Sequence, residues 1–149
     1  MTQRLLIIVS IVLLTLAPLA GGENYQKQLE QGRNYLNTGS YQMARQLLEK
    51  VVKQTNNQTG VPDLIKLYRV VGDYEPALAL AQNHGDRLTS AEISLYLGRY
   101  SQAKNLLLQA YALQPDNIAV QFNLGYYYYL VGDKSNYIRY FSRIFDDYD

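Results

Sequence analysis

Few residues in this chain have the type and spacing that catalysis or metal binding requires. The chain has no cysteine and a single histidine, His84, so thiol catalysis, zinc–cysteine sites and disulfides are excluded. There is no glycine-rich phosphate loop, and no plausible nucleophile stands near His84. Asp146, Asp147 and Asp149 fit a solvated C-terminal segment better than a metal site. The sequence therefore predicts a protein that is not an enzyme and needs no cofactor and no metal.

Charge gives no reason to expect nucleic acid as a partner. The chain has 14 Lys and Arg against 13 Asp and Glu, a formal net charge of +1. Nucleic-acid binding needs a clustered basic face, which this composition does not indicate. Tyrosine is the unusual residue, with 15 copies beside three Phe and no Trp. Because exposed tyrosine is common at protein interfaces, binding is the chemistry that this composition favours.

The first 22 residues predict an export signal. Residues 5–20 carry no charge, follow Arg4, and are succeeded by Gly21 and Gly22. A positive start, an apolar middle and small residues are typical of a secretory signal peptide. An uncleaved membrane anchor and a buried core helix remain as alternatives, although the run is shorter than the about 20 residues of a membrane span. We expect an exported, periplasmic or extracytoplasmic protein that contacts the membrane only through this segment, if the segment is uncleaved.

The rest of the chain repeats one pattern four times. A turn glycine recurs at Gly39, Gly72, Gly98 and Gly132. The first three are each followed two residues later by a tyrosine that is expected to pack within the array: Tyr41, Tyr74 and Tyr100. Small and apolar residues keep fixed offsets around each glycine, which is the mark of a repeat array. The pattern predicts an all-α domain over residues 23–149 with repeats at about 25–58, 59–86, 87–116 and 117–149. The expected helix pairs are 25–38 with 41–55, 62–71 with 74–83, 89–97 with 100–113, and 117–131 with 134–147.

This pattern resembles the tetratricopeptide repeat, above all at the junction ALQPDNIAVQFNLGYYYYLVGD over residues 112–133. The resemblance covers about residues 25–148. It implies a right-handed superhelical stack of helix-turn-helix repeats that acts as a protein-interaction scaffold, with a concave groove formed by the first helix of each repeat.

Local signals predict where helices begin and how closely they pack. Asp73 and Asp133 follow turn glycines and are expected to cap the next helix. The spacing of Thr89 and Glu92 predicts a capping box that starts a helix at residue 89. In the fourth repeat Tyr137 takes the position of a small alanine, so we expect that helix pair to pack less closely than the others.

Two surfaces are candidates for partner binding. The resemblance places in the groove Leu29, Arg33, Leu36, Asn37, Lys66, Arg69, Glu92, Leu95, Tyr96, Phe122, Tyr126 and Tyr129. An aromatic floor with a basic stretch would suit an apolar peptide with an acidic element. In the last helix one stripe at helical spacing is expected to pack on the array: Tyr137, Phe141, Ile144 and Tyr148. Ile138 and Phe145 point away from this stripe, which predicts an exposed apolar patch. The alternatives are a subunit that self-associates without a peptide ligand, and aromatic residues that only pack within a short array.

Overall fold

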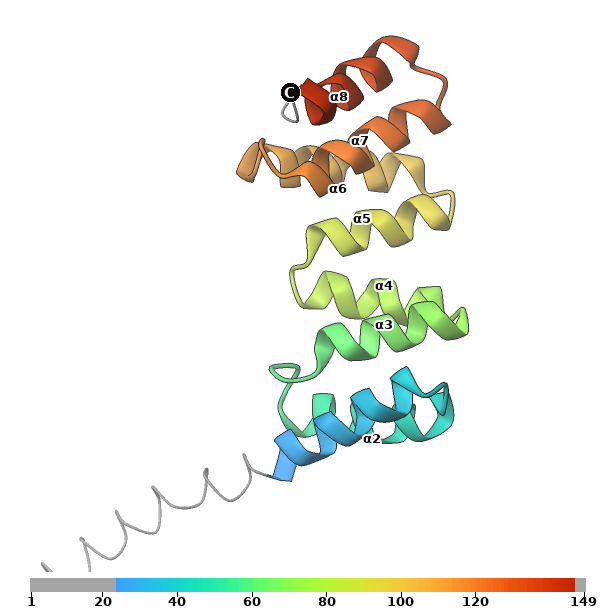
Figure 1. Cartoon of the computed structure of the whole chain (residues 1–149), viewed down its shortest axis with the longest axis vertical. Coiled ribbons are helices and arrows are strands. Elements are labelled where there is room, and N and C mark those ends of the chain that lie inside the picture. The colour runs from blue at the N-terminus through green and yellow to red at the C-terminus, as the bar shows by residue number, and fades with distance from the viewer. Residues whose placement is uncertain (1–23, 147–149) are drawn as a thin grey trace, which may run out of the picture. The chain divides into compact units, whose positions relative to one another are not determined.

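The computed structural model describes residues 24–146, and this part of the chain is helical throughout, without a strand. A first helix covers residues 24–37. It is followed by α2 (Tyr41–Gln54), α3 (Val61–Val71), α4 (Tyr74–Asn83), α5 (Arg87–Tyr96), α6 (Tyr100–Leu113), α7 (Ile118–Leu130) and α8 (Lys134–Asp146) (Figure 1). The helices begin and end within two residues of the predicted bounds. The predicted all-α class and the helix-turn-helix pairing are confirmed.

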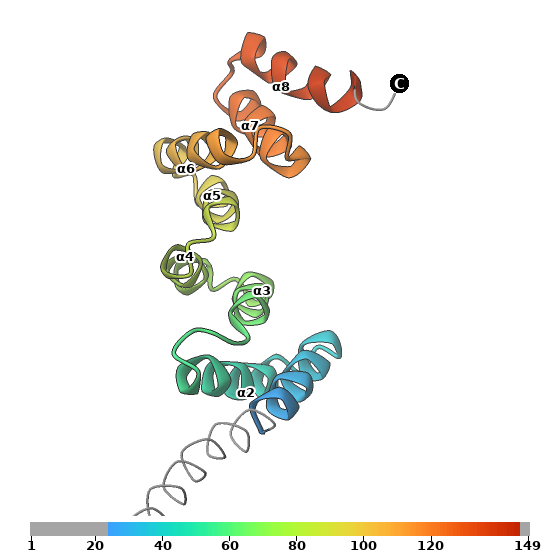
Figure 2. The ribbon, with the colours of Figure 1, turned by 90° about the vertical axis from the view of Figure 1, so that its left-hand side faces the viewer.

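The chain divides into two compact units, one up to Leu67 and the other from Tyr68 onward, and the division falls within α3. In the first unit, Leu48 and Val51 of α2 and Val61 of α3 are fully buried. In the second unit the helices α4 to α8 follow one another, and α5 and α7 lie in one layer while α4 and α6 lie in the other (Figure 2). The predicted single domain over residues 23–149 stays a prediction.

The turn between the helices of a pair is the same in every repeat. Gly39, Gly72, Gly98 and Gly132 all have positive φ, between 70° and 84°. The residue after each glycine donates its N–H to the carbonyl five residues earlier, as from Ser40 to Tyr35 at 2.8 Å. This is a Schellman motif, in which the left-handed glycine ends the helix and the last carbonyls are satisfied. The glycine spacing therefore fixed the positions of the turns.

The fourth helix pair packs as closely as the first. A Cβ atom added at Gly125 would lie 3.0 Å from Cε2 of Phe141, and one added at Gly32 would lie 2.9 Å from Cδ2 of Leu48. Phe141 and Leu48 each follow their glycine by sixteen residues, so the two contacts are equivalent. The expectation of looser packing in the fourth pair is wrong at this contact, because Phe141 rather than Tyr137 faces the glycine.

Three other local predictions need correction. The helix α5 begins at Arg87 rather than at Thr89, and its cap is Asp86, whose carboxylate accepts a hydrogen bond from the Thr89 N–H at 3.0 Å. Tyr41 and Tyr100, which the repeat pattern assigns to packing, are both 40% exposed. Of the two predicted aspartate caps, Asp133 is confirmed, since its carboxylate accepts from the Asn136 N–H at 3.1 Å and from the Asn136 side chain at 2.8 Å. The prediction for Asp73 is wrong, because Asp73 stands at the N-cap position of α4 but its side chain makes no cap hydrogen bond there.

Candidate partner-binding surface

An open hollow of about 660 Å³ lies on the layer of the second unit that contains α5 and α7. Its lining comes from the end of α3, the middle of α5 and most of α7. The lining residues are Arg69, Glu92, Ile118, Ala119, Phe122, Asn123 and Tyr126. One side of the hollow is polar and the other is aromatic.

The polar side is an ion pair with an added amide. The Nη1 atom of Arg69 lies 3.3 Å from Oε2 of Glu92, and the amide of Asn123 donates to Oε1 of Glu92 at 3.3 Å. The same amide donates to the carbonyl of Ala119 at 2.8 Å, which holds it on α7. Both carboxylate oxygens of Glu92 are therefore engaged, and its charge offsets that of Arg69. The basic stretch expected here from the sequence is locally neutral in the structure.

The same pairing occurs in the first unit. Arg33 lies 2.9 Å from the carboxylate of Asp63, and its side chain remains half exposed. The hydrogen bond that Arg33 donates to the Asp63 carboxylate is the main cause that raises the pKa of Arg33. Arg33 and Arg69, the two arginines predicted for the groove, thus each form an ion pair with an acidic residue of a following helix.

The aromatic side consists of exposed rings on α7. Phe122 is 51% exposed and Tyr126 42%. Tyr126 stacks on Tyr129, with ring centroids 6.5 Å apart and planes at 17°. Phe122 meets Phe141 of α8 edge to face at 5.6 Å. Because these rings expose much of their area and are fixed by neighbouring rings, they offer binding area at a low cost in side-chain entropy.

Not all of the residues predicted to bind a partner are exposed in the structure. Leu29, Leu36 and Leu95 are only 4%, 6% and 6% exposed, so the prediction that they line an open groove is wrong and they belong to the core. The other predicted residues are exposed or, for Glu92, half exposed. The hollow brings together Arg69, Glu92, Phe122 and Tyr126, while Arg33, Asn37 and Lys66 lie in the first unit. Partner binding by any of them stays a prediction.

Sequence reasoning missed two parts of this surface. Ile118 and Asn123 line the hollow, but neither differs from an ordinary helix residue in the sequence. Tyr137 and Phe141 extend the aromatic side onto α8, through edge-to-face contacts with Tyr129 at 6.0 Å and between themselves at 5.4 Å. The tyrosine in place of the small residue at position 137 was the available signal for this extension.

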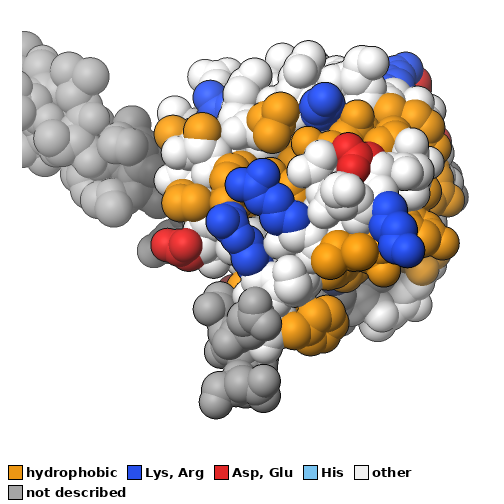
Figure 3. All heavy atoms as spheres, turned by 90° about the horizontal axis from the view of Figure 1, so that it is seen from above, with side chains coloured by type: hydrophobic (Ala, Val, Ile, Leu, Met, Phe, Trp, Pro, Cys, Tyr) orange, Lys and Arg blue, Asp and Glu red, His pale blue; other side chains and the backbone are white. Residues whose placement is uncertain are grey.

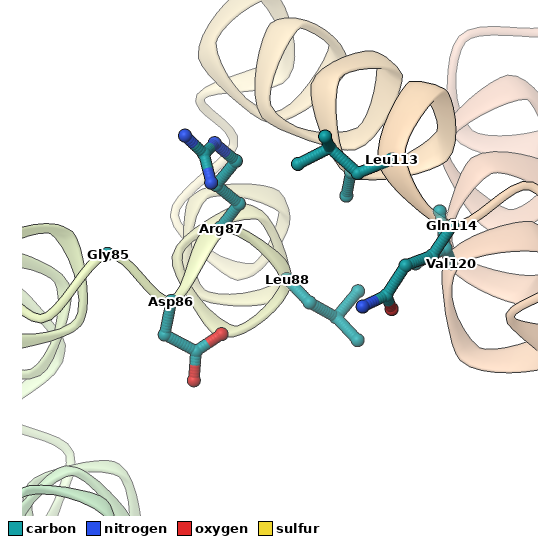
Figure 4. Close-up of a pocket in the computed structure, with 8 residues that line it drawn as sticks. Gly85, Asp86, Arg87, Leu88, Leu113, Gln114 and Val120 are labelled. Carbon is teal, nitrogen blue, oxygen red and sulfur yellow. The ribbon is translucent and has the colours of Figure 1, made fainter.

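A second, smaller hollow of about 210 Å³ lies beside the start of α5 (Figure 4). Gly85, Asp86, Arg87 and Leu88 line it on one side, and Leu113, Gln114 and Val120 on the other. The carboxylate of Asp86 already caps α5. The acidic group of this hollow is therefore already used within the fold.

Metal-binding groups do not assemble in the part of the chain that the structure describes. Within residues 24–146 there is no group of three or more His, Asp or Glu side chains that could hold a metal ion. None of the helices in that range is long and apolar enough to span a membrane. The apolar run over residues 5–20, which carries the signal or anchor prediction, lies outside the described residues.

Comparison with known proteins agrees with this geometry. Residues 88–117, which cover α5, α6 and the loop that leads to α7, match the family model of the tetratricopeptide repeat. The chain contains a tetratricopeptide repeat. This confirms the resemblance that the sequence pattern predicted. No curated protein matches the sequence.

Solved structures of MamA proteins share the fold. The structure "MamA MSR-1 C2" has a TM-score of 0.67 at 22% identity, covering 82% of this chain and 75% of that one. The structure "Crystal structure of MamA protein" has a TM-score of 0.72 at 18% identity, covering 84% and 73%. For "MamA 41-end from Desulfovibrio magneticus RS-1" the TM-score is 0.69 at 16% identity, covering 82% and 74%. At such identities the similarity concerns the tetratricopeptide fold alone.

Proposed function

We propose that this chain is a protein-binding scaffold and that the hollow over α3, α5 and α7 holds an apolar segment of a partner protein. The observation that carries the proposal is the arrangement of that hollow, in which exposed rings of Phe122 and Tyr126 face an ion pair that is already neutralised. Interfaces are enriched in aromatic residues and poor in unpaired charge at their centre, as this surface is. The tetratricopeptide repeat and the fold shared with MamA proteins support a scaffold role.

The pairing of Arg69 with Glu92 defines the chemistry of the segment. A ligand carboxylate would have to displace Glu92, which is also held by Asn123. A neutral segment needs no such exchange, and its side chains can cover the rings of Phe122 and Tyr126. The segment that fits best is therefore apolar and uncharged, with Leu, Ile, Phe or Met side chains, rather than apolar and acidic.

Site-specific photo-crosslinking tests this function. A benzoylphenylalanine at position 118, where Ile118 is 46% exposed at the edge of the hollow, should give a defined adduct with a partner protein in cells that make the chain. Phe122→Ala and Tyr126→Ala should remove that adduct. The matched control is the same probe at Met43, which is equally exposed at 46% but lies in the first unit. No adduct at position 118, or an adduct that both alanine changes leave intact, would rule out binding in the hollow.

The compartment is a second part of the proposal. The uncharged run over residues 5–20 behind Arg4 supports an extracytoplasmic location, with the segment either cleaved or kept as an anchor. Alkaline phosphatase joined after Asp149 reports the location, because the enzyme folds only where disulfides form. We expect activity from the fusion. An uncut fusion recovered inactive from the cytoplasm would contradict this location.

A further inference from the structure

The third and fourth helix pairs can be compared residue by residue. Their turn glycines Gly98 and Gly132 are 34 residues apart, so each residue of α5 and α6 has a counterpart 34 positions later in α7 and α8. In the third pair a set of apolar residues belongs to a buried cluster that includes residues of the next helix along the chain, α7. That set includes Leu95, Ala103 and Leu107, which are 6%, 0% and 0% exposed.

The helix α7 covers the third pair with one stripe. Val120, Leu124 and Tyr127 share one core cluster with the residues of α5 and α6. They are spaced at i, i+4 and i+7, which places them on one face of α7. The third pair therefore packs against a helix face with apolar residues at i, i+4 and i+7.

The fourth pair carries aromatic residues at the same places, without a covering helix among the described residues. Tyr129, Tyr137 and Phe141 take the positions of Leu95, Ala103 and Leu107. Tyr129 is 63% exposed where its counterpart is 6% exposed. Phe145 is 68% exposed, whereas its counterpart Tyr111 is half-buried. We call these four residues, Tyr129, Tyr137, Phe141 and Phe145, the open face.

We propose that the open face binds an amphipathic helix of another protein, which takes the place that α7 takes on the third pair. The covering helix would present apolar residues at i, i+4 and i+7, as α7 does. Tyr129 and Phe145 are the exposed anchors, and aromatic side chains at such positions carry much of the energy of an interface. The open face shares no residue with the lining of the hollow, although Tyr129 stacks on Tyr126 at its edge, so this inference goes beyond the proposed function.

Lys134 shares the side of α8 that carries the open face, since it precedes Tyr137 by three residues and Phe141 by seven, whereas Arg139 and Arg143 lie on the opposite side of the helix. Lys134, Arg139 and Arg143 of α8 are exposed, and their counterparts on α6 are the uncharged Tyr100, Asn105 and Gln109. Arg139 lies over the ring of Tyr140 at 5.9 Å, and Arg143 donates a hydrogen bond to the Tyr111 hydroxyl. The face of the molecule at the α8 end shows hydrophobic side chains together with more basic than acidic ones (Figure 3). Lys134 is therefore the basic group of α8 beside the open face, and an acidic residue at the flank of the partner helix complements it.

The first helix of a second copy does not have the required face. Gly32 corresponds to Gly125, so the residues that match the covering stripe of α7 are Lys27, Gln31 and Asn34. All three are polar and exposed. Head-to-tail stacking of copies would bury these polar groups against aromatic rings without hydrogen-bond partners. The open face therefore points to a different protein.

A synthetic helix tests the proposal on the purified full chain. The probe is a fluorescein-labelled amphipathic peptide of about five turns, with Leu at i, i+4, i+7 and i+11 and Glu on both flanks. Fluorescence anisotropy should show saturable binding. The double substitution Tyr129→Ser and Phe145→Ser should weaken binding at least about tenfold. Leu113→Ser, at a side chain that is 67% exposed on α6, is the matched control and should leave binding unchanged.

Three results would overturn the inference. The first is no binding of the probe, and the second is equal binding of a peptide of the same composition with its Leu residues spread around the helix. The third is a dimer of the full chain in sedimentation equilibrium that Phe145→Ser abolishes, since a second copy would then occupy the open face. Phe145→Ser separates the two proposals, because it should weaken probe binding to the open face and leave crosslinking from position 118 in the hollow intact.

Discussion

Gly125 of α7 lies directly against the ring of Phe141 of α8, so closely that a Cβ atom at position 125 would stand 3.0 Å from Cε2 of that ring. This contact sets the separation of the two helices that carry the open face. Three atoms of the ring lie within 3.2 Å of the same point, so the ring would have to move to admit a larger side chain.

Gly125→Leu should therefore lower the free energy of unfolding. Overpacking a close helix contact costs about 1–3 kcal/mol. The better helix propensity of leucine, about 0.8 kcal/mol, acts in the opposite direction and offsets part of this. Urea unfolding followed by circular dichroism measures the difference. With Phe141→Ala added, the loss should be smaller than the sum of the two single losses, because the ring no longer resists the leucine. Strictly additive losses would show that the two residues do not oppose each other.

The four consecutive tyrosines of α7 should differ in their effect on stability. Tyr128 is half-buried and stacks on Tyr140, with centroids 5.6 Å apart and planes at 6°. Tyr128→Ala should lower the free energy of unfolding by about 2 kcal/mol, below the range for a fully buried ring because part of this ring is exposed. Tyr126→Ala should change it by no more than about 0.5 kcal/mol. Thermal unfolding of both variants checks the order, and equal losses would contradict the assigned faces.

Alkaline pH should destabilise the second unit through the stacked tyrosines. Burial is the main cause that raises the pKa of both Tyr128 and Tyr140 above the ordinary value. The folded state then keeps protons that the unfolded state releases, so stability falls as pH rises above about 10 and is unaffected by these groups below it. The double variant Tyr128→Phe and Tyr140→Phe should lose less stability than the native chain between about pH 8 and about pH 11. Tyr129→Phe, at an exposed ring, is the control and should behave as the native chain.

Much of the fold followed from the sequence because its determinants are local. The turn glycines at fixed offsets from small and apolar residues placed every helix of the described chain to within two residues. The side on which a residue lies was harder to predict. Leu29, Gly32 and Leu36 are spaced at i, i+3 and i+7, so they share one face, and Gly32 turns that face toward Leu48. The helical periodicity therefore places Leu29 and Leu36 correctly in the core, whereas the family resemblance placed them wrongly in the groove.

The chemistry of the hollow depended on contacts that no local pattern contains. Arg69 and Glu92 are 23 residues apart, and Asn123 is 31 residues beyond Glu92. Only the packing of α3, α5 and α7 brings these groups together, so the sequence predicted a basic stretch where the structure has a neutral one. The open face was partly visible in advance, since Phe145 was expected to be exposed. The other residues of the open face could be identified only by comparison with the buried cluster of the third pair.

Substitutions at the start of α5 distinguish the cap predicted from the sequence, Thr89, from the cap in the structure, Asp86. The pattern makes Thr89 the cap, whereas in the structure the Asp86 carboxylate accepts from the Thr89 N–H, so the Thr89 side chain is not required. Asp86→Ala should lower the free energy of unfolding by about 1 kcal/mol, the usual loss for an N-cap, and Thr89→Ala should change it by less than about 0.5 kcal/mol. Asp86→Asn is the matched variant that keeps the acceptor, and it should retain most of the stability.

Since α5 carries Glu92, fraying of its first turn should also loosen the polar side of the hollow, which a reduced crosslinking yield at position 118 would report. A larger loss from Thr89→Ala than from Asp86→Ala would mean that Thr89 caps α5 and that the capping box predicted from the sequence is formed.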